Sequence, residues 1–308
     1  MEGIGGKVQA LPFDKPGRFW KGNVHTHSTR SDGKLTPAEV VAAYKARGYD
    51  FVAITDHFME RFGYPVVDTS IHRDETFMTL FGAELHGPRI TNGDIWHLLA
   101  VGLPLDFAQP VDRDETGPSL ARRAAEAGAF VAIAHPAWYT LTLEDALSIE
   151  VAHAVEIYNH TTTHHNDRGD GWFMSDLLSM SGRRLHTIAV DDAHFSTRPD
   201  AFGGWVQVKA ESLDPDALLE SLKTGHFYAS QGPELHDVAI VGEEIRVACS
   251  PARVIFATGL GSASRHLRGD ALTDATFPLE PFMTGGYVRI TVIDDGGKRA
   301  WSNPIWLS

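Results

Sequence analysis

The chain has 308 residues, of which 43% are hydrophobic and 22% are charged, a balance that is typical of folded globular domains and excludes a disordered or fibrous protein. Its 27 basic and 40 acidic residues give a net charge of −13, which argues against binding to nucleic-acid polymers or to anionic membranes. The single cysteine, Cys249, excludes an internal disulfide framework and a thiolate zinc cluster.

The first 232 residues alternate short apolar runs with helical patterns. A helix is expected after Thr36, because Thr36, Pro37 and Glu39 form a capping box with a proline at the first helical position. Further helices are expected at residues 119–127, at residues 172–180 and after Asp214, and strands at residues 22–28, 51–55, 129–134, 154–158, 185–190 and 205–208. About seven or eight alternating units of this kind predict parallel βαβ units that close into a TIM-like barrel.

The pattern changes at Gly232 and Pro233. From residue 235 onward, apolar and polar side chains alternate without a helical pattern, with runs at residues 238–241, 244–248, 253–257 and 287–293. This tail predicts a small antiparallel β-sandwich. We therefore expect two domains, an α/β barrel over residues 1–232 and a β-sandwich over residues 233–308.

Histidines and carboxylates stand at or beside the ends of the predicted strands. The nine residues of this kind are His25, His27, Asp32, His57, Glu84, His97, His135, Asp192 and His194. Any one of them, taken alone, is more simply a core histidine or a turn residue, as for Asp32 before Gly33. The strand ends of a barrel meet on one face, however, so the set as a whole predicts a metal site. Imidazole and carboxylate donors without a thiolate suit Zn²⁺, Mn²⁺ or Fe²⁺, and nine donors fit about two or three ions.

The motifs at these positions are His25-Thr26-His27, Ser31-Asp32-Gly33, Ile54-Thr55-Asp56-His57, Gly82-Ala83-Glu84, His97-Leu98-Leu99, Ala134-His135-Pro136 and Asp192-Ala193-His194. In type, order and spacing they resemble the PHP (polymerase and histidinol phosphatase) family of metal-dependent hydrolases, over about residues 20–230. The resemblance implies a distorted seven-stranded β/α barrel and a trinuclear metal centre, with all nine residues as ligands. The ending over residues 299–306 resembles the CehA/McbA-type branch of that family, which includes carbamate-ester hydrolases.

Several further residues are candidates for contact with the substrate. Arg61, Arg168 and Arg198 lie in loops that are expected at the site face, and an arginine fork matches a phosphate group well. Asn159 and His160 follow another predicted strand, and we include Asn159 among the candidate substrate contacts. His160 donates a proton to the leaving group, binds the substrate, or orients a metal ligand.

The predicted function is a metal-dependent phosphoesterase that hydrolyses a small phosphomonoester or phosphodiester through a metal-bound hydroxide. The alternative is a carbamate, amide or ester hydrolase that uses the same cluster. The complete ligand set disfavours a non-catalytic metal-binding module, and the acidic net charge disfavours a nuclease on long polymers. A cyclic amidohydrolase ranks lower, because no lysine ends a predicted strand to bridge the metals.

The expected partners are therefore a small-molecule substrate and two to three divalent ions, Mn²⁺, Fe²⁺ or Zn²⁺. The apolar runs are too short to cross a bilayer, and residues 1–10 show no secretory signal, so a cytoplasmic location is expected. The sequence does not address the oligomeric state.

Overall fold

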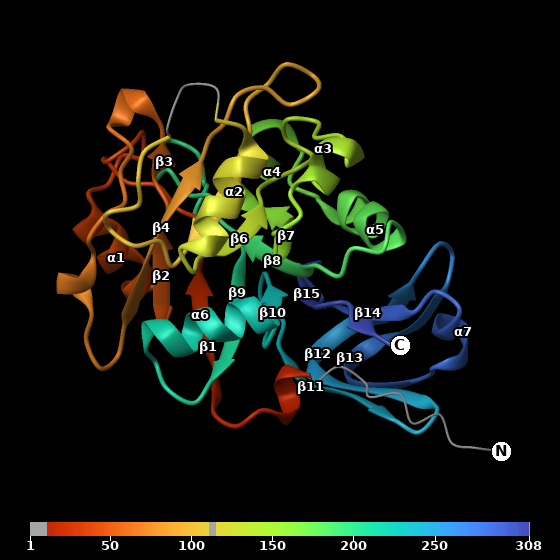
Figure 1. Cartoon of the computed structure of the whole chain (residues 1–308). Coiled ribbons are helices and arrows are strands. Elements are labelled where there is room, and N and C mark those ends of the chain that lie inside the picture. The colour runs from red at the N-terminus through yellow and green to blue at the C-terminus, as the bar shows by residue number, and fades with distance from the viewer. Residues whose placement is uncertain (1–10, 111–114, 308) are drawn as a thin grey trace.

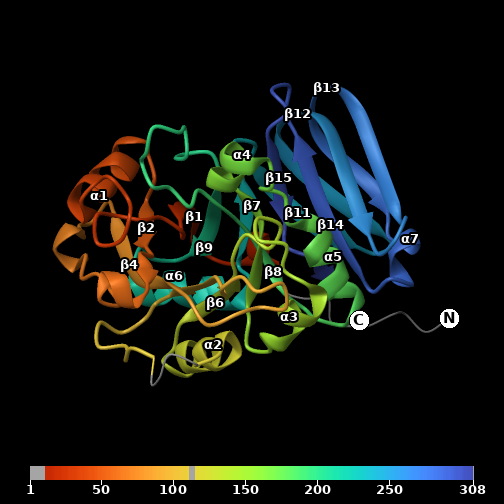
Figure 2. The ribbon, with the colours of Figure 1, turned by 90° about the horizontal axis from the view of Figure 1, so that it is seen from above.

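The computed structural model describes residues 11–110 and 115–307, so the expectation about a secretory signal in residues 1–10 falls outside the described residues. Within these ranges the strands join into one 16-stranded sheet, with helices packed against its α/β part (Figure 1). The described residues include no helix that is long and apolar enough to span a membrane. Figure 2 shows the tail strands standing beside the α/β part of the chain.

The α/β part alternates strands and helices. Its strands are β1 (Arg18–Asn23), β2 (Phe51–Ile54), β3 (His57–Phe58), β4 (Met78–Leu85), β5 (Leu98–Val101), β6 (Phe130–Ile133), β7 (Ala154–Asn159), β8 (His186–Val190) and β9 (Trp205–Ala210). Its helices are α1 (Pro37–Ala46), α2 (Gly117–Glu126), α3 (Leu143–Ser148), α4 (His160–Asn166), α5 (Trp172–Met180) and α6 (Pro215–Thr224), with short 3₁₀ helices at Pro12–Asp14, Glu60–Phe62 and Ser70–His72. The α1 helix begins as predicted, with the reciprocal capping box between Thr36 and Glu39.

The strand directions differ from an all-parallel arrangement. β1–β2, β2–β4, β6–β7 and β7–β8 pair in parallel, as alternating units predict. β5 instead runs antiparallel to both β4 and β6, because residues 86–97 connect β4 to β5 without a crossover helix. β9 is also antiparallel to β1. The reversal of β5 places its first residues, beside His97, at the edge where the parallel strands end.

The backbone beyond β1 meets the backbone beyond β8. The His27 N–H donates to the Ala193 carbonyl, and the Asp192 N–H donates to the His25 carbonyl, both at 2.9 Å. Thr26 and Ala193 form a parallel bridge between the same segments. These bonds join the two ends of the run of strands from β1 to β8, and they bring His25 and His27 against Asp192.

The central strands are buried on both faces. β2, β5 and β6 are buried at every position, which is why their sequences form continuous apolar runs. Phe51, Leu98 and Phe130 are among the largest fully buried side chains. Burial of each such side chain stabilises the fold by roughly 1.5–3 kcal/mol. The strand ends that carry the polar residues are therefore fixed by a packed core.

The tail is antiparallel β structure, as predicted. Together with β10 (Phe227–Ser230), it contains β11 (Leu235–Val241), β12 (Glu244–Gly259), β13 (Ser264–Pro278), β14 (Tyr287–Ile293), β15 (Arg299–Ser302) and β16 (Ile305–Trp306). A short helix, α7 (Glu280–Met283), interrupts it, against the expectation of a tail without helices. β15 pairs with β10, and β10 pairs with β9, so one sheet runs from the tail into the α/β part.

Polar contacts cross the predicted domain boundary. The buried Asn303 accepts a hydrogen bond from the Thr187 N–H at 2.7 Å and donates to the carbonyls of Gly225 and Phe227 at 3.1 and 2.9 Å. Arg289 on β14 forms an ion pair with Asp176 on α5. Through these hydrogen bonds and this ion pair, the tail contacts β8, β10 and α5.

Candidate metal centre

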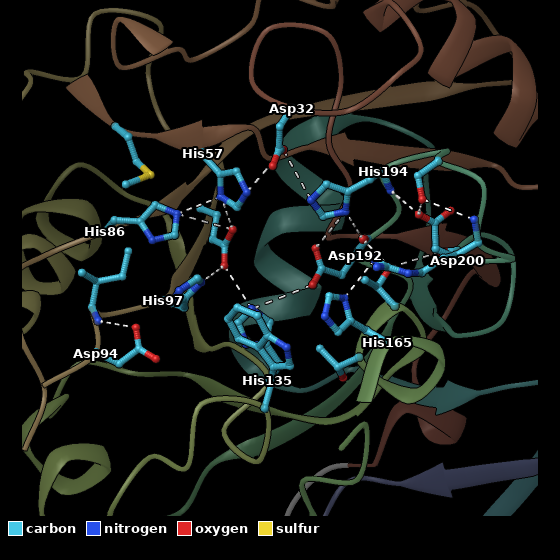
Figure 3. Close-up of a pocket in the computed structure, with 18 of the residues that line it drawn as sticks. Asp32, His57, His86, Asp94, His97, His135, His165, Asp192, His194 and Asp200 are labelled. Carbon is cyan, nitrogen blue, oxygen red and sulfur yellow. Dashed lines mark hydrogen bonds and ion pairs between the residues drawn. The ribbon is translucent and has the colours of Figure 1, made fainter. Parts of the chain in front are cut away.

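The nine residues predicted as metal ligands come together at one edge of the sheet. Figure 3 labels six of them, Asp32, His57, His97, His135, Asp192 and His194, around the cavity. They lie at strand ends: after β1, β6 and β8, at the start of β3 for His57, near the end of β4 for Glu84 and just before β5 for His97. Seven of them line a cavity of about 590 Å³, and His25 and His27 lie fully buried behind it. The Asp32 side chain, which is 42% exposed, stands at the rim.

One group of donors surrounds the Asp32 carboxylate. Asp32 Oδ1 lies 3.4 Å from His57 Nε2 and 3.4 Å from His194 Nε2. Two ligands of a tetrahedral ion, each bound at about 2.0–2.1 Å, are about 3.3–3.4 Å apart. His27 completes this group, and its ring lies against those of His57 and His194. The spacing therefore fits one metal ion.

A second group of donors surrounds Glu84. Glu84 Oε1 lies 2.7 Å from His97 Nδ1 and 3.1 Å from His135 Nε2. Its other oxygen, Oε2, lies 3.8 Å from His25 Nε2 and 3.7 Å from His27 Nε2. Because its two oxygens face different histidines, the Glu84 carboxylate is shared between neighbouring groups of donors.

Asp192 holds a similar central position. Its Oδ1 lies 2.9 Å from His27 Nε2 and 3.4 Å from His25 Nε2, and its Oδ2 lies 3.9 Å from His135 Nε2. The donors near Asp192 thus overlap with those of both other groups. This overlap is the arrangement expected of a cluster with shared carboxylates.

The donor set fits a metal centre. Among the described residues, three buried nitrogen atoms of this cluster have no hydrogen-bond partner: His25 Nε2, His27 Nδ1 and His135 Nδ1. Glu84 Oε2 also makes no hydrogen bond, although it lies 2.6 Å from His57 Nδ1 as an ion pair. Burial of a polar atom without a partner is costly, and a cation that binds such donors removes that cost. The atoms are imidazole nitrogens and carboxylate oxygens, which suit Zn²⁺, Mn²⁺ and Fe²⁺.

The protonation states also favour a cation. Burial lowers the pKa of His27 to about 3 and that of His97 to about 4, so both rings are neutral at pH 7, the form that binds metals. Burial alone would raise the pKa of Glu84, but the histidines around it, His57 first and His135 through a hydrogen bond, hold it well below its usual range. Burial opposes a proton on His57 as well, yet Glu84 and Asp32 raise its pKa to about 10, so a metal ion bound there displaces a proton.

Two ligand positions have an unusual backbone. His135 and Asp192 have φ angles of 22° and 56°, in the left-handed region that non-glycine residues rarely adopt. Such conformations cost on the order of 1–3 kcal/mol and persist where the surrounding structure enforces them, often at functional sites. Here they turn the side chains toward the shared cavity at the ends of β6 and β8.

Two acidic residues that we did not predict hold the ligands in place. Glu156 Oε1 lies 2.6 Å from His25 Nδ1, and its Oε2 accepts the His135 N–H at 2.8 Å. Asp56 accepts the Ser28 N–H at 2.7 Å and the Ser31 hydroxyl at 2.6 Å, which fixes the turn that presents Asp32. Asp56 directly precedes the predicted ligand His57 in the Thr55-Asp56-His57 motif, so the sequence could have identified it as a residue of the site.

Asp191, the residue before the predicted ligand Asp192, accepts hydrogen bonds from five different residues. It accepts hydrogen bonds at 2.8–2.9 Å from Asn23 Nδ2, the Tyr44 hydroxyl and the N–H groups of Phe202, Gly203 and Gly204. Burial raises the pKa of Asp191 to about 6, against the lowering effect of these donors. The carboxylate ties the loop over residues 192–204 to the strand ends that hold the cluster.

The predicted arginines occupy different places. Arg61 and Arg198 line the cavity, and Arg198 Nη1 lies 2.9 Å from His165 Nδ1. Lys34, which we did not predict, lines it as well. Arg168 is not among the described residues that line the cavity; its Nη1 lies 3.5 Å from the Trp138 carbonyl.

The other two candidates lie beside the cluster. Asn159 is buried, and its Nδ2 donates to Glu156 at 3.0 Å and to Asp192 at 3.1 Å. It therefore contacts a predicted ligand and is not among the described residues that line the cavity. His160 begins α4, is bonded to the Tyr158 hydroxyl at 2.7 Å and is not among the described residues that line the cavity. Burial lowers the pKa of His160 to about 4, so the ring is neutral at pH 7.

No protein-family model matches the chain, and no curated protein matches it at a significant level. Among solved structures, the chain is similar to a two-domain protein from Bacteroides vulgatus that contains a predicted PHP-like metal-dependent phosphoesterase. The TM-score is 0.50, with 15% identity over 94% of this chain and 96% of that one. The chain therefore has the mixed α/β fold of that two-domain protein along nearly its whole length.

Two further solved structures are similar at lower scores. A protein from Bifidobacterium adolescentis, provisionally assigned as a metal-dependent phosphoesterase, has a TM-score of 0.45 and 14% identity over 65% of this chain and 94% of that one. An amidohydrolase from Chromobacterium violaceum, with bound sulfate and no metal, has a TM-score of 0.40 and 16% identity over 56% of this chain and 87% of that one.

Proposed function

We propose that this chain is a metal-dependent hydrolase of the PHP family that acts as a phosphoesterase on a small phosphomonoester or phosphodiester. The observation that carries the proposal is the convergence of nine histidines and carboxylates, seven of which line one cavity of about 590 Å³ and two of which lie buried behind it. The likeness in fold to a protein that contains a predicted PHP-like phosphoesterase adds support.

In this proposal, two or three divalent ions are held by His25, His27, Asp32, His57, Glu84, His97, His135, Asp192 and His194. Such ions activate water for attack at neutral pH and neutralise charge on the reacting oxygens. Glu84 and Asp192 hold the donor groups together, and Glu156 orients His25 through the 2.6 Å contact to its Nδ1. The chain itself contributes metal-binding nitrogen and oxygen atoms that are fixed in position and, for most of the nine residues, buried away from water.

The cations around the cavity favour an anionic substrate. Lys34, Arg61 and Arg198 line it and are placed to neutralise a phosphate group. A carbamate, amide or ester hydrolase is the second candidate, because Met59, Ile95 and Trp138 give the same cavity an apolar wall that suits a neutral group.

We also propose the finer architecture that the resemblance implies. The strands from β1 to β8 would form the distorted (β/α)7 barrel of the PHP type, supported by the bonds that link residues 25–27 to residues 192–193. The tail would form a β-sandwich domain over residues 233–308, as in the CehA/McbA-type branch. The two-domain organisation of the Bacteroides vulgatus protein supports this division.

A paired substrate screen tests the function. Protein loaded with Mn²⁺, Fe²⁺ or Zn²⁺ is incubated with aryl phosphomonoesters and phosphodiesters, and with aryl carbamates, amides and esters of the same alcohol. We expect release of the alcohol from the phosphate compounds, loss of that activity on chelation, and its return on adding metal. Hydrolysis of the carbamates or amides without phosphoester hydrolysis would contradict the first candidate and favour the second.

A further inference from the structure

His86 is a buried histidine in the cavity wall that does not belong to the nine predicted ligands (Figure 3). It follows Glu84 by two residues, just beyond the end of β4. Its ring lies between that of His57 and the backbone of Trp96. His86 and His165 are thus the two described histidines that line the cavity without belonging to the predicted ligands, and of these His86 contacts a ligand directly.

The contact with Trp96 fixes the tautomer of His86. His86 Nδ1 lies 2.9 Å from the Trp96 carbonyl oxygen, which can only accept a hydrogen bond. Nδ1 therefore carries the proton, and in a neutral ring Nε2 is left as an acceptor. The anchor is rigid, because Trp96 is buried and packs so closely on Gly117 that a side chain there would collide with its ring.

The free nitrogen of His86 faces His57. His86 Nε2 lies 2.9 Å from His57 Nδ1, so the His57 Nδ1–H donates, and once His57 has lost its second proton its Nε2 is left bare. That bare atom is the one that lies 3.4 Å from Asp32 Oδ1, at the spacing of two ligands on one ion. The 2.9 Å separation of the two nitrogens is a hydrogen-bond length. His57, Glu84 and His86 also lie close enough together to hold a metal ion, so direct ligation by His86 is the alternative that the variants below distinguish.

We propose that His86 is a positioning residue: it holds the proton of His57 on Nδ1 and so presents His57 Nε2 to the ion bound with Asp32 and His194. The inference rests on the metal centre of the proposed function. Glu84 Oε2 lies 2.6 Å from the same His57 nitrogen. Glu84 is a predicted ligand, so a bound metal ion would occupy its carboxylate and His86 would remain as the acceptor for the His57 N–H.

A series of substitutions separates the two bonds of His86. His86→Gln places an amide oxygen near the position of Nε2 and keeps an acceptor for His57. His86→Asn places an amide N–H near Nδ1 and keeps only the bond to Trp96. His86→Phe keeps the ring and loses both bonds. His226→Gln, at a partly exposed histidine before β10, serves as the matched control.

The measurement is the affinity of the chelator-stripped, full-length proteins for Zn²⁺, read by competition with a chromophoric chelator and without substrate. We expect His86→Gln and the control to bind within about threefold of wild type, and His86→Asn and His86→Phe to weaken one site by about 10- to 100-fold. Thermal unfolding of each stripped variant shows that it is folded before titration.

Two results would overturn the inference while leaving the metal centre intact. If His86→Asn and His86→Phe bind Zn²⁺ as tightly as wild type, His86 does not position His57. If His86→Gln loses as much affinity as His86→Phe, the acceptor role is wrong. Failure of the wild-type protein itself to bind Zn²⁺, Mn²⁺ or Fe²⁺ is a different outcome, because it would refute the proposed metal centre as well.

Discussion

Asp192→Ala is expected to remove at least one bound metal ion per chain and to lower kcat/KM by about 10³-fold or more. Its Oδ1 lies 2.9 Å from His27 Nε2 and 3.4 Å from His25 Nε2, so the substitution deletes the carboxylate that these two buried histidines share. It also leaves Asn159 Nδ2, at 3.1 Å from Oδ2, without this acceptor. Elemental analysis and steady-state kinetics on the same preparation give both quantities.

A matched control distinguishes loss of a ligand from a general change in charge. Asp216→Ala removes one exposed carboxylate from the first turn of α6, away from the cavity, and should keep the metal content and kcat/KM of wild type. Full metal content and activity in Asp192→Ala would remove Asp192 from the centre.

Asp191→Ala is expected to lower the free energy of unfolding by about 3–5 kcal/mol, because it strips the acceptor from five buried or partly buried donors at once. The five donors belong to Asn23, Tyr44, Phe202, Gly203 and Gly204. Urea unfolding should be measured with a chelator present, so that the result reports hydrogen bonds and not bound metal.

Asp170→Ala is the control for that measurement. Asp170 is exposed and accepts the Trp172 N–H at 2.9 Å, so its loss should cost about 1 kcal/mol or less. A destabilisation of Asp191→Ala no larger than that of Asp170→Ala would mean that the Asp191 bonds do not hold the strand ends together.

Local patterns in the sequence predicted the helices and the central strands well. The capping box at Thr36 and the apolar runs at Phe51–Ile54 and Phe130–Ile133 act within a few residues, and the structure confirms them. The direction of β5 was missed, because strand polarity depends on a connection without a helix at residues 86–97. β13 was also missed, since most of its side chains are exposed and carry no buried alternation.

The ligand candidates could be named because each is tied to a strand end. Residues that act on the ligands could not be named, since their partners lie far away in sequence. Glu156 meets His25 across 131 positions, and Asp191 meets Asn23 across 168. His160 follows a strand, as predicted, but a helix begins there, with Asn159 accepting the Thr162 N–H as its cap. The His160 ring therefore contacts the Tyr158 hydroxyl and does not line the cavity.

The metal content of the purified protein tests the central claim most directly. Elemental analysis of active, desalted protein should find two to three equivalents of Mn²⁺, Fe²⁺ or Zn²⁺ per chain, as nine converging nitrogen and oxygen donors require. Chelation should abolish activity, and adding back the metal should restore it. Active protein that holds less than one equivalent of these metals would contradict the account.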